Sequence, residues 1–460
     1  MQYFGVLLTI IIFCALSINS CYALSRTEIT HLLMRTSYGI QTNQVSTLLQ
    51  LDRKQAIELI LTKIRTEHYI DPPKWLGEQA ISKNKNLSKE DRKKINKIRR
   101  ERSIDLKAWW FKEMLSTPSP FTEQMTLFWH NHFTSSLRKV KSPKLMYLQN
   151  TLLRKHALGN FRDLLHAITE DPAMILYLDN QSNRKGKPNE NYARELLELF
   201  TLGEGNYSED DIKEAARAFT GYQINRRTGE FFINFRQHDF SEKTFMNRTG
   251  KFIGEDIVDI ILEKPKVARY ISEKIARKFI SAPSERLLAD VANTFFNSSY
   301  EIMPLIRNII NSDEFWNENN RGTMIKSPVE LILGTLRTLG FQPSEYRPLV
   351  QGSRRMGQDI FDPPNVKGWP GGKQWITTNT FLARKSVLIK FIKGAQKAHQ
   401  MMNRMSMQTM DKMHMQVKLP PMEHLNEYGL ATKPVFDMSN KRNIRNFLTS
   451  LIHEPSYQLK

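Results

Sequence analysis

A helix that the sequence predicts over Pro188–Gly203 concentrates acidic side chains on one face. At about 100° per residue, the apolar side chains fall on one side. The other side carries Glu190, Asn191, Arg194, Glu195 and Glu198. Two of these carboxylates could serve as the general acid and base of a hydrolase, whereas Asn191 and Arg194 could help to bind a polar ligand. The alternative is an ion-pair ladder, because Glu190, Arg194 and Glu198 are spaced i, i+4 and i+8.

Histidines form the second group of candidates. In the run Phe128–Phe133 (FWHNHF), a helix turns the side chains of His130 and His132 roughly 160° apart, so the two cannot chelate one ion together. Imidazole combined with carboxylate suits Zn, Mn or Fe(II). The metal-ligand candidates are therefore His130, His132, Glu198 and His238, and Asp239 is a further acid/base candidate. The alternative is that these histidines are hydrogen-bonded groups of the core.

A stiff loop carries two tryptophans. Asp362–Trp375 contains three prolines and three glycines, which break helices and central strands. At the rim of a pocket, Trp369 and Trp375 could stack on a sugar or a peptide. The alternative is that both indoles anchor an ordered loop to neighbouring helices.

Helical periodicity dominates the elements that must position these groups. Capping signals at Ser25 and Ser208 open amphipathic helices, and Ser119-Pro120 places a cap and a first-turn proline before another. A β-hairpin is expected at Gly221–Phe235, where two apolar runs flank the turn Arg226–Gly229. The expected fold class is mainly α: a multi-helix globular protein with one short β-hairpin near 221–235.

Composition divides the chain into five expected segments. These are a signal peptide at 1–23, a helical region with the hairpin at 24–250, a second helical region with the Pro/Gly/Trp loop at 251–395, a Met-rich flexible insert at 396–440, and a terminal helix at 441–460. Low-complexity bias explains the insert, and the alternative is a copper(I) site made of thioethers.

The leader predicts export. Val6–Leu16 is an apolar run too short to span a bilayer, and Cys21-Tyr22-Ala23 is an acceptable cleavage pattern. Cys14 and Cys21 are the only cysteines, so the exported chain would have no thiol for disulfides, nucleophilic catalysis or metal binding. We expect a periplasmic or secreted protein with no transmembrane span after signal removal. The alternative is a lipid anchor at Cys21.

Positive charge is distributed unevenly along the chain. The formal net charge is +20, and Lys83–Arg102 holds ten Lys or Arg residues against three acids. Such a field would attract anionic lipid, lipopolysaccharide or acidic glycan, and the alternative is a solvated basic helix that aids solubility. The run has no interleaved aromatics for base stacking, so no nucleic-acid partner is expected.

Long motifs run through nearly the whole chain after the leader. They are HLLMRTSYG (His31–Gly39), LFWHNHF (Leu127–Phe133), NRKGKPNENYARELLELFTLG (Asn183–Gly203), FDPPNVKGWPGGKQWITTNTFLAR (Phe361–Arg384) and LIHEPSYQLK (Leu451–Lys460). With these motifs the chain resembles the bacterial domain-of-unknown-function 1800 family. The resemblance implies an exported, α-rich protein with sulfatase-like proteins as genetic neighbours, and one of these is a candidate partner. It implies no activity, substrate, cofactor or catalytic residue, and the basic run and the Met-rich segment depart from the family pattern.

Three functions are consistent with these patterns. The first is an envelope or secreted accessory protein that binds a glycan, a peptide or a partner protein through the Glu190–Glu198 face and the Trp369–Trp375 loop. The second is a metal-dependent or acid/base hydrolase that uses His132, Glu195, Glu198 and His238. The third is a cationic binder of polyanions or membrane surfaces. We favour the first because it requires the fewest assumptions about chemistry.

Overall fold

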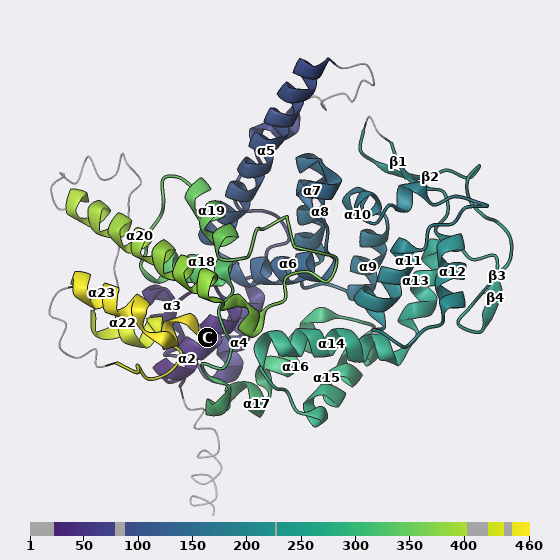
Figure 1. Ribbon diagram of the computed structural model, residues 1–460. Helices are drawn as coiled ribbons and strands as arrows, with labels where there is room; N and C mark the ends of the chain where they lie inside the picture. Colours follow the sequence, from purple (N-terminus) through teal and green to yellow (C-terminus); the bar gives the residue numbers. More distant parts are fainter. Residues whose placement is uncertain (1–22, 79–87, 226–227, 403–421, 437–443) are drawn as a thin grey trace, which may run out of the picture.

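The computed structural model describes residues 23–78, 88–225, 228–402, 422–436 and 444–460. The expected signal peptide lies outside the described residues except for its last position. The start of the basic run and most of the Met-rich insert lie outside them as well. Within the described ranges, helices dominate and the β-structure is limited to short hairpins, which confirms the expected mainly α class (Figure 1).

The helices follow one another with short connections. The first half of the chain contains α2 (Arg26–Thr36), α3 (Thr42–Leu48), α4 (Arg53–Thr62), α5 (Lys89–Ser116), α6 (Pro120–His132), α7 (Leu137–Val140), α8 (Pro143–His156), α9 (Phe161–Thr169), α10 (Pro172–Tyr177), α11 (Asn191–Glu195) and α12 (Glu209–Ala218). The second half contains α13 (Gly254–Leu262), α14 (Pro265–Phe279), α15 (Glu285–Asn297), α16 (Ile302–Asn311), α17 (Asp313–Trp316), α18 (Pro328–Thr338), α19 (Arg347–Arg355), α20 (Thr378–Met402), α22 (Met422–Gly429) and α23 (Ile444–His453). No described helix is long and apolar enough to cross a membrane.

Side-chain caps fix where several helices begin. Ser25 forms a capping box with Glu28 at the start of α2, and Ser208 forms one with Asp211 at the start of α12, so both expected start signals are confirmed. Ser119 precedes α6 but does not cap it, because its hydroxyl contacts the hydroxyl of Thr122 at 2.8 Å.

Two antiparallel hairpins interrupt the helices. The expected one is confirmed: β1 (Tyr222–Ile224) pairs with β2 (Phe231–Ile233). A second, unexpected hairpin pairs β3 (Lys243–Phe245) with β4 (Arg248–Gly250). Its turn residues, Met246 and Asn247, have φ of 48° and 65°, as a type I′ turn requires. Met246 is an unusual residue for that conformation, so the turn had no clear sequence signal.

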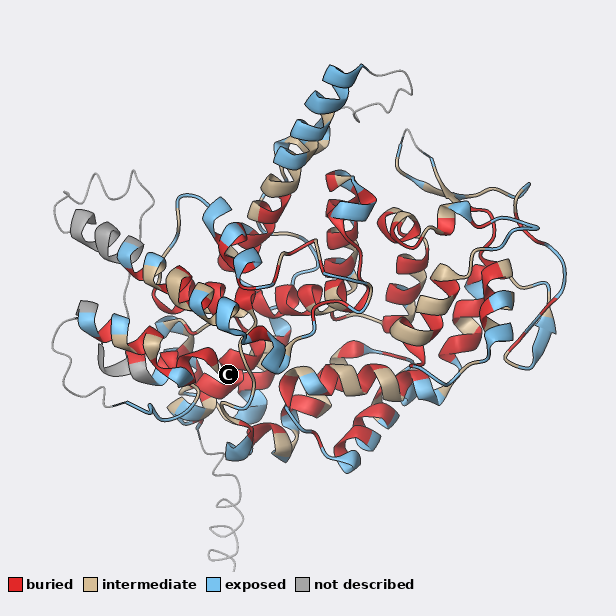
Figure 2. Ribbon diagram, in the orientation of Figure 1, coloured by how far each residue is buried: buried red, intermediate tan, exposed pale blue. Residues whose placement is uncertain are grey.

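The buried side chains form one continuous hydrophobic cluster that includes residues from Leu24 to Tyr457. Helix α6 lies inside this arrangement and packs against α2, α5 and α8, while α14, α15 and α16 pack on one another (Figures 1 and 2). Both faces of α6 are buried for most of its length. Most side chains of the Phe128–Phe133 run are therefore surrounded by protein.

Helix α5 combines an exposed half with a buried half. Its basic N-terminal part projects from the body of the molecule and is mostly exposed, whereas the part after Leu106 enters the core (Figures 1 and 2). Trp110, in the buried part, donates an indole hydrogen bond of 2.8 Å to Glu123 on α6.

A buried ion pair connects α6 to α8. The guanidinium of Arg154 contacts Glu123 at 2.5 Å and 3.0 Å, and the two side chains are only 1% and 2% exposed. Each charge has lost its hydration and depends on the other for stabilisation.

Removal of one partner of this pair is predicted to destabilise the fold. Glu123→Gln leaves the Arg154 charge buried and uncompensated, and should lower the free energy of unfolding by about 3–5 kcal/mol. The exposed pair between Arg347 and Asp105 provides a matched control, because Asp105→Asn should change stability by less than about 1 kcal/mol. Urea unfolding followed by circular dichroism measures both. Equal small losses for the two variants would contradict the assigned role of the buried pair.

Candidate functional site

The acidic helix ends in a π-helical turn. Helix α11 begins at Asn191, and from Leu196 to Thr201 (η3) the chain adopts the wider π-helix, with Leu202 N–H bonded to the Leu197 carbonyl at 2.9 Å. One regular helix was expected over Pro188–Gly203, so the regular pattern is wrong for its second half. Such turns recur at functional sites. Glu195 and Glu198 are both half-buried here.

The carbonyl groups at the end of this turn have no partners within the helix and are bonded by side chains from other elements. Tyr270 and Lys274 of α14 both donate to the Leu199 carbonyl, each at 3.1 Å. Nε2 of His132, at the end of α6, lies 3.1 Å from the Phe200 carbonyl. The π-turn is thus held from below by two helices.

The hydrogen-bond partners of His132 define its protonation. Nε2 faces a carbonyl and must therefore carry the hydrogen, which leaves Nδ1 to accept from the Lys274 ammonium at 3.3 Å. Burial, together with the nearby Lys274 charge, keeps the pKa of His132 well below its usual value. Burial also lowers the pKa of Lys274 to about 8. His132 is a neutral support of the π-turn, with both ring nitrogens engaged.

Tyrosines surround Glu198. The Tyr207 hydroxyl donates to Glu198 at 3.2 Å, and the Tyr270 ring lies beside the Lys274 ammonium at 4.3 Å. Burial and the negative charge of Glu198 raise the pKa values of both phenols to about 12. Both tyrosines therefore remain protonated, and Tyr207 donates to Glu198 whereas Tyr270 donates to the Leu199 carbonyl.

Glu195 adds a second carboxylate next to the first. Burial and the charge of Glu198 raise its pKa, while the charges of Lys367 and Arg194 oppose the shift. Burial and the Glu195 charge in turn raise the pKa of Tyr177. We use the name carboxylate–tyrosine surface for the set Tyr177, Glu195, Glu198, Tyr207, Tyr270 and Lys367, of which Tyr177 is buried.

The Pro/Gly/Trp loop that contributes Lys367 is docked on α6. The side-chain oxygen of Asn131 accepts the Trp369 backbone N–H at 2.7 Å. Gly368 has φ +82°, and a Cβ at this position would lie 2.4 Å from the same oxygen, so only glycine permits this approach. The His130 ring packs against Trp369 and Phe361.

Both tryptophans of the loop are inside the protein. Trp369 is 5% and Trp375 is 6% exposed, so neither indole offers an open face for stacking on a ligand. The loop reaches the carboxylate–tyrosine surface through Lys367 instead. Of the two expected roles, anchoring agrees with this placement.

Three residues of the acidic face are engaged in structure. Arg194 pairs with Glu190 at 3.2 Å, as expected for i, i+4, and with Glu209 of α12 at 2.9 Å. The expected ladder does not continue to Glu198, because the π-turn changes the spacing and Glu198 is bonded by Tyr207. The Asn191 side chain donates to the Leu178 carbonyl at 3.0 Å.

His238 and Asp239 lie in a separate environment after the first hairpin. Nδ1 of His238 is 2.7 Å from the Thr220 carbonyl, and its ring packs against Phe240. Burial would raise the pKa of Asp239, but hydrogen bonds from Ser241 and Arg217 outweigh it and lower the pKa. This carboxylate is a permanently charged partner of Arg217.

The four expected metal ligands are not brought together. In the part of the chain that the structure describes, no group of three or more His, Cys, Asp or Glu residues is placed to hold a metal ion. The ring of His130 packs among Trp110, Phe361 and Trp369, whereas that of His132 packs against Phe133 and Phe200. The two imidazoles therefore face different surroundings, as their positions on one helix had indicated.

Sequence reasoning missed four members of the surface and its main support. Tyr177, Tyr207, Tyr270 and Lys367 surround the carboxylates, and Lys274 lies beneath them. All of them lie outside the acidic helix, and only the packing of their elements against that helix brings them close to the carboxylates. The one available signal was Lys367, because it lies inside the conspicuous Pro/Gly/Trp loop.

Comparisons with known proteins give one match. A family model described as "Protein of unknown function (DUF1800)" matches residues 31–459. No curated protein and no solved structure matches the chain.

The anchoring of the loop by Asn131 leads to a stability prediction. Asn131→Ala leaves the Trp369 N–H without its acceptor and should lower the free energy of unfolding by about 1–3 kcal/mol. Asn365, whose side chain accepts from Lys367 N–H in an exposed turn of the same loop, is the control, and Asn365→Ala should cost about 0.5 kcal/mol or less. Urea unfolding followed by tryptophan fluorescence measures both. A smaller effect at Asn131 than at Asn365 would show that the loop is held elsewhere.

The lowered pKa of Lys274 leads to a prediction about pH. Between pH 8 and 10.5 the unfolded chain binds more protons at this lysine than the folded protein, so the lysine destabilises the fold fully below pH 8 and progressively less as pH rises. The free energy of unfolding of Lys274→Met, compared with that of wild type, should therefore be most favourable near pH 7. This advantage should fall by up to about 3 kcal/mol toward pH 10.5. Unfolding curves at several pH values test this. Lys266→Met, at an exposed position of α14, should show no such trend.

Proposed function

The chain belongs to the DUF1800 family, and we propose that it is an exported binding protein that holds a glycan with hydroxyl or amino groups on its carboxylate–tyrosine surface. Export is supported by the apolar leader Val6–Leu16. The placement of the glycan is supported by the chemistry of the surface. Carboxylates accept hydrogen bonds from sugar hydroxyls or ammonium groups, and tyrosines add apolar ring area.

One observation carries the proposal: Glu195 and Glu198 form no salt bridge with any other described residue. The protein has a formal net charge of +20, so cations are abundant, yet Arg194 on the same helix pairs with Glu190 and Glu209 instead. Neither residue has a buried oxygen without a partner, so water completes the free acceptor positions of these half-buried carboxylates, and donors of a ligand can replace that water.

The support beneath the surface favours binding without a large rearrangement. The π-turn is held through its carbonyls by His132, Tyr270 and Lys274. A site whose backbone is already fixed loses less conformational freedom when the ligand binds. This arrangement suits a protein that recognises one ligand geometry.

Calorimetric titration with two tetrasaccharides tests the proposal. The probes are β-1,4-linked tetraglucosamine and its N-acetylated counterpart, with tetralysine as a third ligand. Wild-type protein should bind at least one tetrasaccharide, and the double variant Glu195→Gln, Glu198→Gln should bind it at least about tenfold more weakly, since it loses charge-assisted hydrogen bonds. Glu209→Gln, which changes a neighbouring exposed carboxylate, should bind like wild type. Binding of tetralysine alone would reassign the ligand to a cationic peptide, and no binding of any probe would overturn the proposal.

A second candidate function is hydrolysis of the same glycan, and the raised pKa of Glu195 favours it. Two neighbouring carboxyl groups, one of them with a raised pKa, are the kind of pair that supplies the general acid of glycoside cleavage. In that case the titrated tetrasaccharide would release reducing ends on longer incubation. Glu195→Gln alone would then abolish the release while binding is retained. Intact tetrasaccharide in the wild-type sample would contradict this second function.

A further inference from the structure

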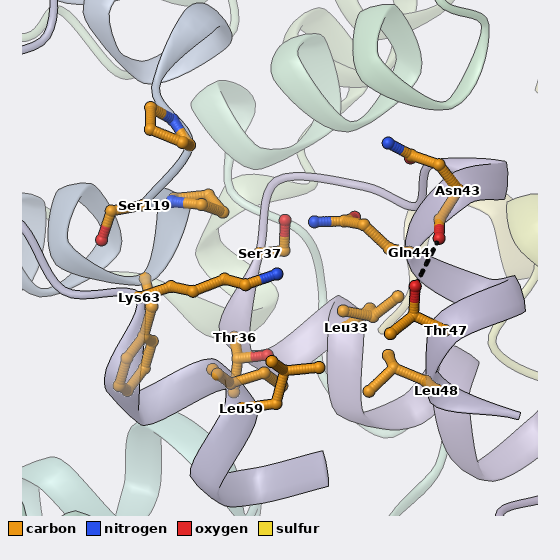
Figure 3. Close-up of a pocket in the computed structure, with 14 residues that line it drawn as sticks. Leu33, Thr36, Ser37, Asn43, Gln44, Thr47, Leu48, Leu59, Lys63 and Ser119 are labelled. Carbon is orange, nitrogen blue, oxygen red and sulfur yellow. Dashed lines mark hydrogen bonds between the residues drawn. The ribbon is translucent and has the colours of Figure 1, made fainter. Parts of the chain in front are cut away.

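A cavity of about 150 Å³ lies far along the chain from the carboxylate–tyrosine surface, between α2, α3, α4 and the start of α6 (Figure 3). Its floor is apolar and includes Leu33, Leu48, Leu59 and Phe121. A volume of roughly this size accommodates a six-carbon apolar group when the lining is aliphatic and aromatic. The floor therefore fits a small branched hydrocarbon.

Polar groups lie at one side of the same cavity. The Ser37 hydroxyl and the side-chain carbonyl oxygen of Gln44 are buried and have no hydrogen-bond partner, and Ser37 is only 4% exposed. Buried polar atoms are nearly always bonded, so two of them lining one cavity indicate a missing partner. Figure 3 shows the Gln44 side chain extending toward Ser37, with its amide nitrogen at the near end and its oxygen further back.

A cation completes the polar side. The Lys63 side chain extends over the cavity, and its ammonium points toward Ser37 and Gln44 (Figure 3). No acid among the described residues forms a salt bridge with it. The ammonium and the serine hydroxyl are donors suited to a carboxylate, whereas the glutamine oxygen requires a donor from the ligand.

We propose that this cavity binds a small aliphatic carboxylate that carries a donor on its α-carbon, that is, a branched α-amino or α-hydroxy acid. The carboxylate contacts Lys63 and Ser37, the α-amino or α-hydroxyl group donates to Gln44, and the branched side chain packs against Leu33, Leu48 and Leu59. Each polar atom without a partner gains one of complementary type. The site is separate from the proposed glycan site, and its success or failure does not depend on that proposal.

Four ligands of similar size dissect the recognition. L-Valine and 2-hydroxyisovalerate carry both the carboxylate and the α-donor; isovalerate lacks the donor, and isobutylamine lacks the carboxylate. Calorimetric titration of the purified protein should show binding of valine, 2-hydroxyisovalerate or both. Isovalerate should bind at least several-fold more weakly and isobutylamine not at all. The stronger of the first two ligands identifies the donor as an ammonium or a hydroxyl.

Two variants and one control test the placement. Lys63→Met keeps the stem and removes the charge, and should weaken binding about tenfold or more, as expected for one charge-assisted hydrogen bond. Thr47→Trp places a large ring at an exposed position of the rim and should block entry without disturbing the core. Lys54→Met, at an exposed position of α4, the helix that Lys63 directly follows, should bind like wild type. Equal binding of all four ligands, unchanged binding in Thr47→Trp, or no binding by wild type would overturn the proposal.

Discussion

The last turn of α6 supports two segments of the carboxylate–tyrosine surface, the loop with Lys367 and the π-turn with Glu198. Asn131 accepts the Trp369 N–H and fixes the loop that carries Lys367, and the next residue, His132, donates to the carbonyl at the end of the π-turn that carries Glu198. Both bonds start from adjacent residues of one buried helix. The Pro/Gly/Trp loop and the π-turn are therefore fixed to the same support. The fixed spacing between the loop and the acidic helix follows from this one turn.

The supporting groups explain why charge near the surface is arranged as it is. Lys274 bonds to the Leu199 carbonyl and to the neutral ring of His132 from beneath, so its charge lies close to the negative end of the turn. Tyr270 shares the same carbonyl. These donors bond to the backbone carbonyl and to His132, and neither of them forms a hydrogen bond or a salt bridge with Glu195 or Glu198. The backbone that carries Glu195 and Glu198 is thereby fixed without a salt bridge to either carboxylate.

Much of the fold could be predicted from the sequence, because local signals determine it. The capping boxes at Ser25 and Ser208 and the first hairpin are encoded within a few residues. The site was only partly predictable. Glu195 and Glu198 stood out on their helix, but the π-turn depends on carbonyl partners from α6 and α14, which periodicity does not reveal. The expected gathering of distant histidines failed for the same reason, since burial and hydrogen bonding at His132 are decided by packing.

In helix α5, the half that is buried in the core stabilises the half that is exposed. Its basic first half has few contacts of its own, and an isolated helix of that length is marginal in water because the first turn is costly to nucleate. Its second half is fixed in the core by Leu106, Trp110 and their neighbours. The buried half therefore replaces the unfavourable nucleation step. Each further residue of the exposed half then gains one helical hydrogen bond for the ordering of one residue. Backbone amides should exchange with solvent progressively faster toward the tip, so that the projecting arm is a graded rather than an all-or-none structure.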